Sequence, residues 1–121
     1  GGCKYCRESK GEKRISKILS DNNIEFVREY KDERCRYKKV LPFDFAVFNK
    51  GRLECLIEYD GELHYNIARW SNSSERLQLT LIKDNIKSTF AKDNKIKLIR
   101  IPYWEFDNIE KILKHELRTL F

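Results

Sequence analysis

The chain of 121 residues contains no methionine, only four cysteines and no long hydrophobic run. No apolar stretch approaches the ~18 residues of a transmembrane helix, so we expect no membrane-spanning segment and no membrane partner. The N-terminus shows no signal-peptide pattern, and without one so few cysteines do not indicate a disulfide framework. The cytosol is therefore the expected compartment. The Gly1-Gly2 start and the lack of methionine lead us to expect an excised domain with sequence missing upstream.

Internal repeats and low-complexity tracts are also absent, and the length suits one domain. Hydrophobic residues make up 40% of the chain and aromatic residues 12%, which indicates a substantial core and excludes a disordered chain. The formal net charge is +6. A basic chain of this size favours a polyanionic partner, most commonly a nucleic acid, although a solvated lysine-rich surface would give the same charge.

Cys3 and Cys6 have the spacing of half a zinc site. No second pair follows at a matching interval, so either the other ligands lie upstream or the pair is a boundary remnant; Cys35 could also join the site in space. We expect residues 1–10 to be a tail left from an upstream zinc-binding module, and 11–121 to be the functional domain. Cys55 lies in an apolar strand pattern and is interpreted as a core residue.

Hydrophobic periodicity and turn residues predict a mixed α/β fold. The predicted elements are a helix over 11–22, strands over 24–30, 41–48 and 53–60, a loop over 61–74, a helix over 75–94, a strand over 97–101 and a helix over 106–120. Gly51 suits a tight turn between the second and third strands, which would pair antiparallel. The strand reached through the long helix is expected to be parallel to its neighbour.

Expected core positions follow from the same patterns. In the first strand Ile24, Phe26 and Val27 should point inward, and Trp104 should pack against the last helix. The buried face of the long helix should be formed by Leu79, Ile82, Ile86 and Phe90.

Two neighbouring apolar strands each carry an acidic residue, Asp44 and Glu58. Burying an unpaired charge is costly, so carboxylates in such strands indicate a purpose. Side by side, they would offer hard oxygen ligands to a divalent cation, most simply Mg²⁺, with Mn²⁺ as a substitute. His64 follows the second strand and is a candidate general base. The combination indicates a metal-dependent phosphodiesterase.

The order of these pieces resembles the PD-(D/E)xK nuclease superfamily, and most closely its very-short-patch-repair-like branch, which includes phage homing endonucleases with an E, D, H, D set. The matching pieces are Gly11-Glu12, Pro42-Phe43-Asp44, Ile57-Glu58-Tyr59-Asp60-Gly61 with His64, Asp84 with Lys87, and Leu98-Ile99-Arg100-Ile101-Pro102-Tyr103. The resemblance covers residues 11–121. It implies an αβββαβα restriction-endonuclease-like core, with a central mixed β-sheet flanked by helices.

One position departs from the superfamily pattern, which has a lysine two residues after the second acid. Asp60 stands there in this chain. In the branch that the chain resembles, a histidine takes over the proton-transfer role, and His64 lies where the resemblance requires it. A lysine-dependent mechanism is therefore not expected.

The other candidate residues each have two interpretations. Glu12 could contact a metal-bound water or simply favour the helix N-terminus. Asp84 could orient the His64 imidazole or be an ordinary surface residue. Asp60 could bind metal at the edge of the site or stabilise the turn at Gly61. Lys87 could contact a phosphate or be solvated.

The loop over 61–74 carries Tyr65, Arg69 and Trp70, which could contact DNA, since aromatic side chains stack on bases or wedge between them. The same aromatic residues could instead pack the loop onto the core.

The sequence therefore predicts the catalytic domain of a Mg²⁺-dependent endonuclease acting on double-stranded DNA, of the homing type. A single site cuts one strand at a time, so cleavage of both strands would imply a homodimer on DNA or sequential nicking. Alternatives are a mismatch-directed nicking repair enzyme, a structural-RNA nuclease, and a non-catalytic nucleic-acid-binding module of the same fold.

Overall fold

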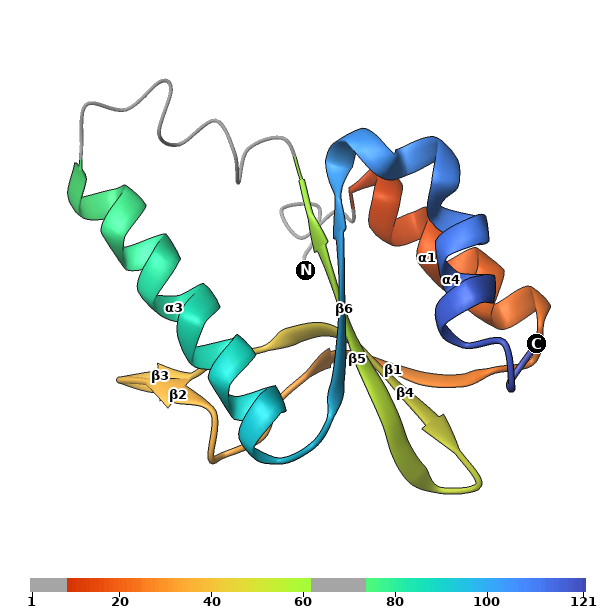
Figure 1. The fold of residues 1–121 in the computed structure, drawn as a ribbon, viewed down its shortest axis with the longest axis horizontal. Helices are drawn as coiled ribbons and strands as arrows, with labels where there is room; N and C mark the ends of the chain where they lie inside the picture. Colours follow the sequence, from red (N-terminus) through yellow and green to blue (C-terminus); the bar gives the residue numbers. More distant parts are fainter. Residues whose placement is uncertain (1–8, 62–73) are drawn as a thin grey trace.

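A four-stranded mixed sheet forms the centre of the protein in the computed structural model, which describes residues 9–61 and 74–121 (Figure 1). The strand order is β1-β4-β5-β6, and a small separate hairpin of β2 and β3 lies beside the sheet. In chain order the elements are α1 (Lys10–Asp21), β1 (Glu25–Tyr30), β2 (Arg36–Tyr37), β3 (Lys39–Val40), β4 (Phe43–Asn49), β5 (Arg52–Asp60), α3 (Ser74–Asp93), β6 (Lys97–Pro102), the 3₁₀ segment η2 (Tyr103–Asn108) and α4 (Ile109–Glu116). The predicted mixed α/β architecture is confirmed.

Local sequence explains how the strands connect. Strands β4 and β5 pair antiparallel through a two-residue turn in which Lys50 and Gly51 both have positive φ, at 54° and 79°. Two positive φ values in succession define the hairpin turn that matches the natural twist of the strands. Strand β6 then pairs parallel with β5, because helix α3 carries the chain back across the sheet. Both the hairpin and the parallel pairing agree with the sequence prediction.

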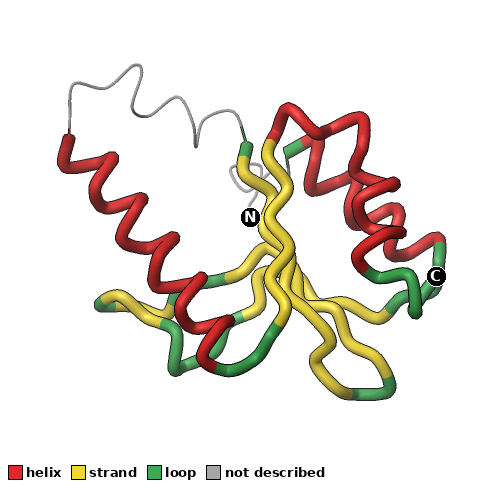
Figure 2. The backbone as a smooth tube through the Cα atoms, in the orientation of Figure 1, coloured by secondary structure: helices red, strands yellow, loops and turns green. Residues whose placement is uncertain are grey.

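Two hydrophobic clusters cover the two faces of the sheet. Figure 2 shows the strands of the sheet between helix α3 on one side and helices α1 and α4 on the other. Alternation along β5 sends Ile57 to the cluster formed with α1 and α4, and Leu56 to the cluster formed with Phe90 of α3. Cys35 and Cys55 are both fully buried and free, one in each cluster, so Cys55 is a core residue as predicted. The sheet is thus a layer between α1 and α4 on one side and α3 with the β2–β3 hairpin on the other.

Helix α1 packs unusually closely against the end of β5. A Cβ atom on Gly11 would overlap the ring of Tyr59, so only glycine allows this approach. Ser9 caps the helix, and its hydroxyl accepts a hydrogen bond from the Glu12 amide at 3.2 Å. The contact places the first turn of α1, and with it Glu12, beside the strand that carries Glu58.

Several sequence predictions about burial and secondary structure are wrong. Val27 is 45% exposed because strict alternation in β1 turns it away from the core. Leu79 and Ile82 are also exposed, since α3 runs away from the sheet and only its C-terminal part, around Phe90, is buried (Figure 1). Trp104 is 61% exposed and makes an edge contact with Tyr103.

The charged connection predicted after the first strand instead contains the β2–β3 hairpin, a two-stranded unit with two residue pairs in register. The strands are too short and too polar to give a periodic sequence signal. Among the described residues, no helix is both long enough and apolar enough to cross a membrane.

Candidate active site

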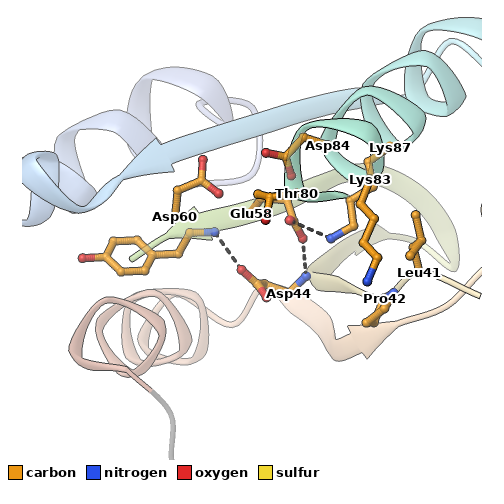
Figure 3. Close-up of a pocket in the computed structure, with 10 residues that line it drawn as sticks. Leu41, Pro42, Asp44, Glu58, Asp60, Thr80, Lys83, Asp84 and Lys87 are labelled. Carbon is orange, nitrogen blue, oxygen red and sulfur yellow. Dashed lines mark hydrogen bonds and ion pairs between the residues drawn. The ribbon is translucent and has the colours of Figure 1, made fainter. Parts of the chain in front are cut away.

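Asp44 and Glu58 meet where β4 and β5 separate. The ladder between these strands runs to the pair Phe45 and Ile57, and the two acids occupy the next position. There the Asp44 amide donates a hydrogen bond to Glu58 Oε2, and the Tyr59 amide donates to Asp44 Oδ2, both at 2.8 Å (Figure 3). Each carboxylate is thus held by the backbone of the opposite strand. The structure therefore brings together the two predicted metal ligands, which we call the carboxylate pair.

The environment of the carboxylate pair makes it unfavourable for both acids to be ionised at once. Burial is the main reason that the pKa of Asp44 is raised, from an ordinary 3.8 to about 7, and the neighbouring Glu58 charge is the next cause. The Tyr59 amide and the Lys87 ammonium act in the opposite direction but do not offset these effects. Glu58 itself is only 6% exposed. Two negative charges at this depth are stabilised by additional positive charge.

Helix α3 supplies one such charge. Lys87 Nζ lies 2.9 Å from Glu58 Oε1, and the lysine side chain is only 13% exposed. The same ammonium lies 5.4 Å from the centre of the Phe43 ring. Lys87 is therefore an integral part of the site, and the interpretation as a solvated lysine is wrong.

Asp60 and Asp84 are brought together by an arginine that the sequence analysis did not single out. Arg100 lies beside Glu58 in the parallel register of β5 and β6. Its guanidinium lies 3.5 Å from Asp60 Oδ1 and 3.9 Å from Asp84 Oδ1, and it donates to the Asp84 carbonyl at 3.3 Å. We call these three residues the Arg100 cluster. A charged residue within the apolar strand Leu98-Ile99-Arg100-Ile101 was the signal that could have identified it.

Glu12 approaches the carboxylate pair from the α1 side. Burial raises its pKa, followed by the charges of Glu29 and Glu58. Its carboxylate forms an ion pair with Arg28 at 3.1 Å. The Glu58 charge therefore acts on the Glu12 carboxylate, as expected if Glu12 belongs to the site. The carboxylate itself is held by Arg28 of β1.

A cavity of about 280 Å³ opens onto these groups. Its walls include Thr80 and Lys83 of α3, neither of which was predicted, and Leu41 with Pro42 from the segment before β4. Acids and lysines are unevenly distributed around it (Figure 3). Asp60 lies at one end, the carboxylate pair in the middle, and Lys83 with Lys87 at the end formed by Leu41 and Pro42.

The remaining predicted residues lie outside the described part of the chain. These are the candidate base His64, the candidate DNA contacts Tyr65, Arg69 and Trp70, and the candidate zinc ligands Cys3 and Cys6. Their predictions stand untested.

The donor set of the carboxylate pair suits a hard divalent cation. Within residues 9–61 and 74–121, no three His, Cys, Asp or Glu side chains gather closely enough to form a complete protein cage. Mg²⁺ does not need one, since it typically keeps several waters and takes one or two carboxylates. A divalent cation would also neutralise the repulsion that raises the pKa of Asp44.

Comparison with known proteins adds no assignment: no family model, curated protein or solved structure matches the chain. Function must therefore be argued from the geometry of the site.

Proposed function

We propose that this domain is a Mg²⁺-dependent endonuclease that hydrolyses phosphodiester bonds in double-stranded DNA. The observation that supports the proposal best is the carboxylate pair. Two acids from adjacent strands converge at the end of a sheet, are held in place by backbone amides, and are left with more negative charge than the site neutralises. Hard oxygen donors beside an open cavity and lysine ammonium groups suit both a cation and a phosphate.

Each side chain has a distinct role in this proposal. Asp44 and Glu58 would hold the Mg²⁺ ion, which when bound supplies Lewis-acid stabilisation of the phosphate and lowers the pKa of water. Lys87 pairs with Glu58 and limits the negative charge that an approaching phosphate meets. Glu12 adds a third carboxylate on the α1 side. His64 would accept a proton from the attacking water, with Asp84 orienting its imidazole.

The finer assignment depends on the resemblance together with the element order. A helix, three sheet strands, a helix, a strand and a helix follow one another, with the β2–β3 hairpin inserted between the first two sheet strands. This order supports a restriction-endonuclease-like core of the very-short-patch-repair-like branch. The homing type is our preferred assignment, with recognition of a long site assigned to other parts of the full-length protein.

Nicking of supercoiled plasmid tests the activity. We expect cleavage in Mg²⁺ or Mn²⁺ and none in EDTA. Asp44→Asn, Glu58→Gln and His64→Ala should each abolish cleavage while the far-UV circular dichroism spectrum is unchanged. Glu54→Gln is the matched control, because Glu54 lies on β5 but is exposed; it should cut like the wild type.

Cation binding is measured separately from turnover. Isothermal titration with Mn²⁺ should show binding to the wild type and to Glu54→Gln, and weak or no binding to Asp44→Asn. Wild-type cleavage rates in either carboxylate variant would refute the proposed site. Cation binding without cleavage of any plasmid would indicate a non-catalytic module.

A further inference from the structure

The β2–β3 hairpin and its flanks form a strongly basic segment next to the site, which we call the basic hairpin (residues 31–40). It contains five lysine and arginine residues and two acids. Both acids are already paired inside the segment, because Asp32 lies 2.8 Å from the Arg34 guanidinium and Glu33 lies 2.9 Å from that of Arg36. Within the segment, no acid is left to pair with Lys31, Lys38 or Lys39.

The lysines at the tip of the basic hairpin are exposed. Lys38 and Lys39 both face solvent, and neither forms an ion pair with any residue in the described ranges. Lys38 occupies the position between the two short strands. These ammonium groups are therefore exposed to an anionic partner, which would break no ion pair with residues 9–61 or 74–121.

The base of the basic hairpin is fixed to the rest of the protein. Cys35 and Leu41 are buried, and the Leu41 amide donates to the Cys35 carbonyl at 2.9 Å. Arg34 donates to the Asn94 side chain at 2.9 Å and lies over the ring of Phe90. These contacts tie the hairpin to the C-terminal end of α3. A surface held in this way loses little conformational entropy when it binds.

The basic hairpin leads directly into the cavity of the site. Leu41 and Pro42, which follow β3, line the cavity, and Lys83 lines it from the opposite element, α3. Figure 3 shows Lys83 on the same side as Leu41 and Pro42, away from Asp60. Unlike Lys87, Lys83 pairs with no acid in the described part of the chain. Positive charge thus continues from the cavity wall toward the hairpin.

We propose that Lys83, Lys38 and Lys39 form a track that binds successive phosphates of one DNA strand, on one side of the bond to be cut. The track extends the proposed nuclease function and rests on it. Lysine offers a compact charge that contacts phosphate oxygens without reading the base, so the track positions the duplex and carries no sequence specificity.

Another surface could bind DNA instead. Exposed lysines also occur on α1, on the β4–β5 turn and on α4, at Lys13, Lys50 and Lys111. Helices α1 and α4 cover the face of the sheet opposite α3 and the hairpin (Figure 1). Replacing these three lysines removes the same charge from elsewhere on the protein, and so provides a matched control.

The experiment measures the affinity for a fluorescein-labelled DNA duplex by anisotropy, in EDTA and over a range of salt concentrations. For the triple variant K38Q/K39Q/K83Q, the slope of log Kd against log salt should fall by about 0.9 for each lysine removed. For the control K13Q/K50Q/K111Q, the slope should differ from that of the wild type by no more than about 0.9, the value for one phosphate contact. Circular dichroism verifies that both variants fold.

Equal losses in the two triple variants would overturn the track, as would failure of the wild type to bind duplex DNA at low salt. Equally tight binding of duplex RNA with the same loss would overturn the assignment to DNA. Cleavage is scored separately: DNA binding that depends on the track, without metal-dependent nicking by the wild type, would refute the nuclease and leave the track standing. With cleavage present, the track variant should raise KM more than it lowers kcat.

Discussion

Replacing Asp44 by asparagine should stabilise the metal-free protein above neutral pH. The pKa of Asp44 is raised to about 7 in the folded protein, against 3.8 as the ordinary value. Between these values the folded protein binds more protons than the unfolded chain, so stability falls as the pH rises. Each pKa unit corresponds to about 1.4 kcal/mol, so the two units from pH 5 to pH 7 should lower the free energy of unfolding by about 2–3 kcal/mol.

Asparagine has the same shape but does not ionise. Its side-chain oxygen can still accept the hydrogen bond from the Tyr59 amide. The stability advantage of Asp44→Asn over the wild type should therefore increase by about 2–3 kcal/mol between pH 5 and pH 8.

Urea unfolding at several pH values between 5 and 8, followed by far-UV circular dichroism, measures this difference. Glu54→Gln on the same strand should follow the wild-type pH profile. Added Mg²⁺ should restore the stability of the wild type at pH 8 and leave Asp44→Asn unchanged, because only the wild type has both carboxylates for the ion. Parallel pH profiles for wild type and Asp44→Asn would refute the electrostatic reasoning.

Three further substitutions probe the supports of the site. Lys87→Gln leaves Glu58 largely buried without its partner and should lower the free energy of unfolding by about 3–5 kcal/mol at pH 8. An unchanged urea midpoint would contradict the buried ion pair. Arg100→Gln removes the cation that joins β6 to α3, so amide hydrogen exchange should accelerate in α3 and not in α1, and uniform exchange would contradict the link. Gly11→Ala places a methyl group against Tyr59 and should cost about 1–3 kcal/mol by urea unfolding, whereas a neutral result would contradict the close packing.

Local patterns in the sequence were sufficient to predict most of the sheet. Alternation and the turn at Gly51 predicted the β4–β5 hairpin. They did not predict the register shift between Val47 and Phe48, which brings Asp44 level with Glu58 instead of Ile57. The helix between β5 and β6 predicted their parallel pairing. These features depend on residues close together in the chain, or on a connection rule that holds for nearly all such units.

Features that depend on how distant elements pack could not be predicted in the same way. Leu79 and Ile82 fit a buried helical stripe, but they lie in the part of α3 that stands away from the sheet, which the helix approaches only near Phe90. Lys87 looked like a surface lysine, because its proximity to Glu58 depends on the angle of that helix. Arg100 gained its role only from the register between β5 and β6, which no local pattern specifies.

The carboxylate pair takes the place of backbone carbonyls at the end of the β4–β5 ladder, and this gives the site its own reporters. The amide protons of Asp44 and Tyr59 point at the carboxylates themselves. Their chemical shifts should therefore follow the ionisation of the pair and the arrival of a cation, without any label or substitution. Their rates of exchange with solvent should show how firmly the two strands hold the acids. How well the two carboxylates are ordered can thus be measured through the hydrogen bonds that the sheet donates to them.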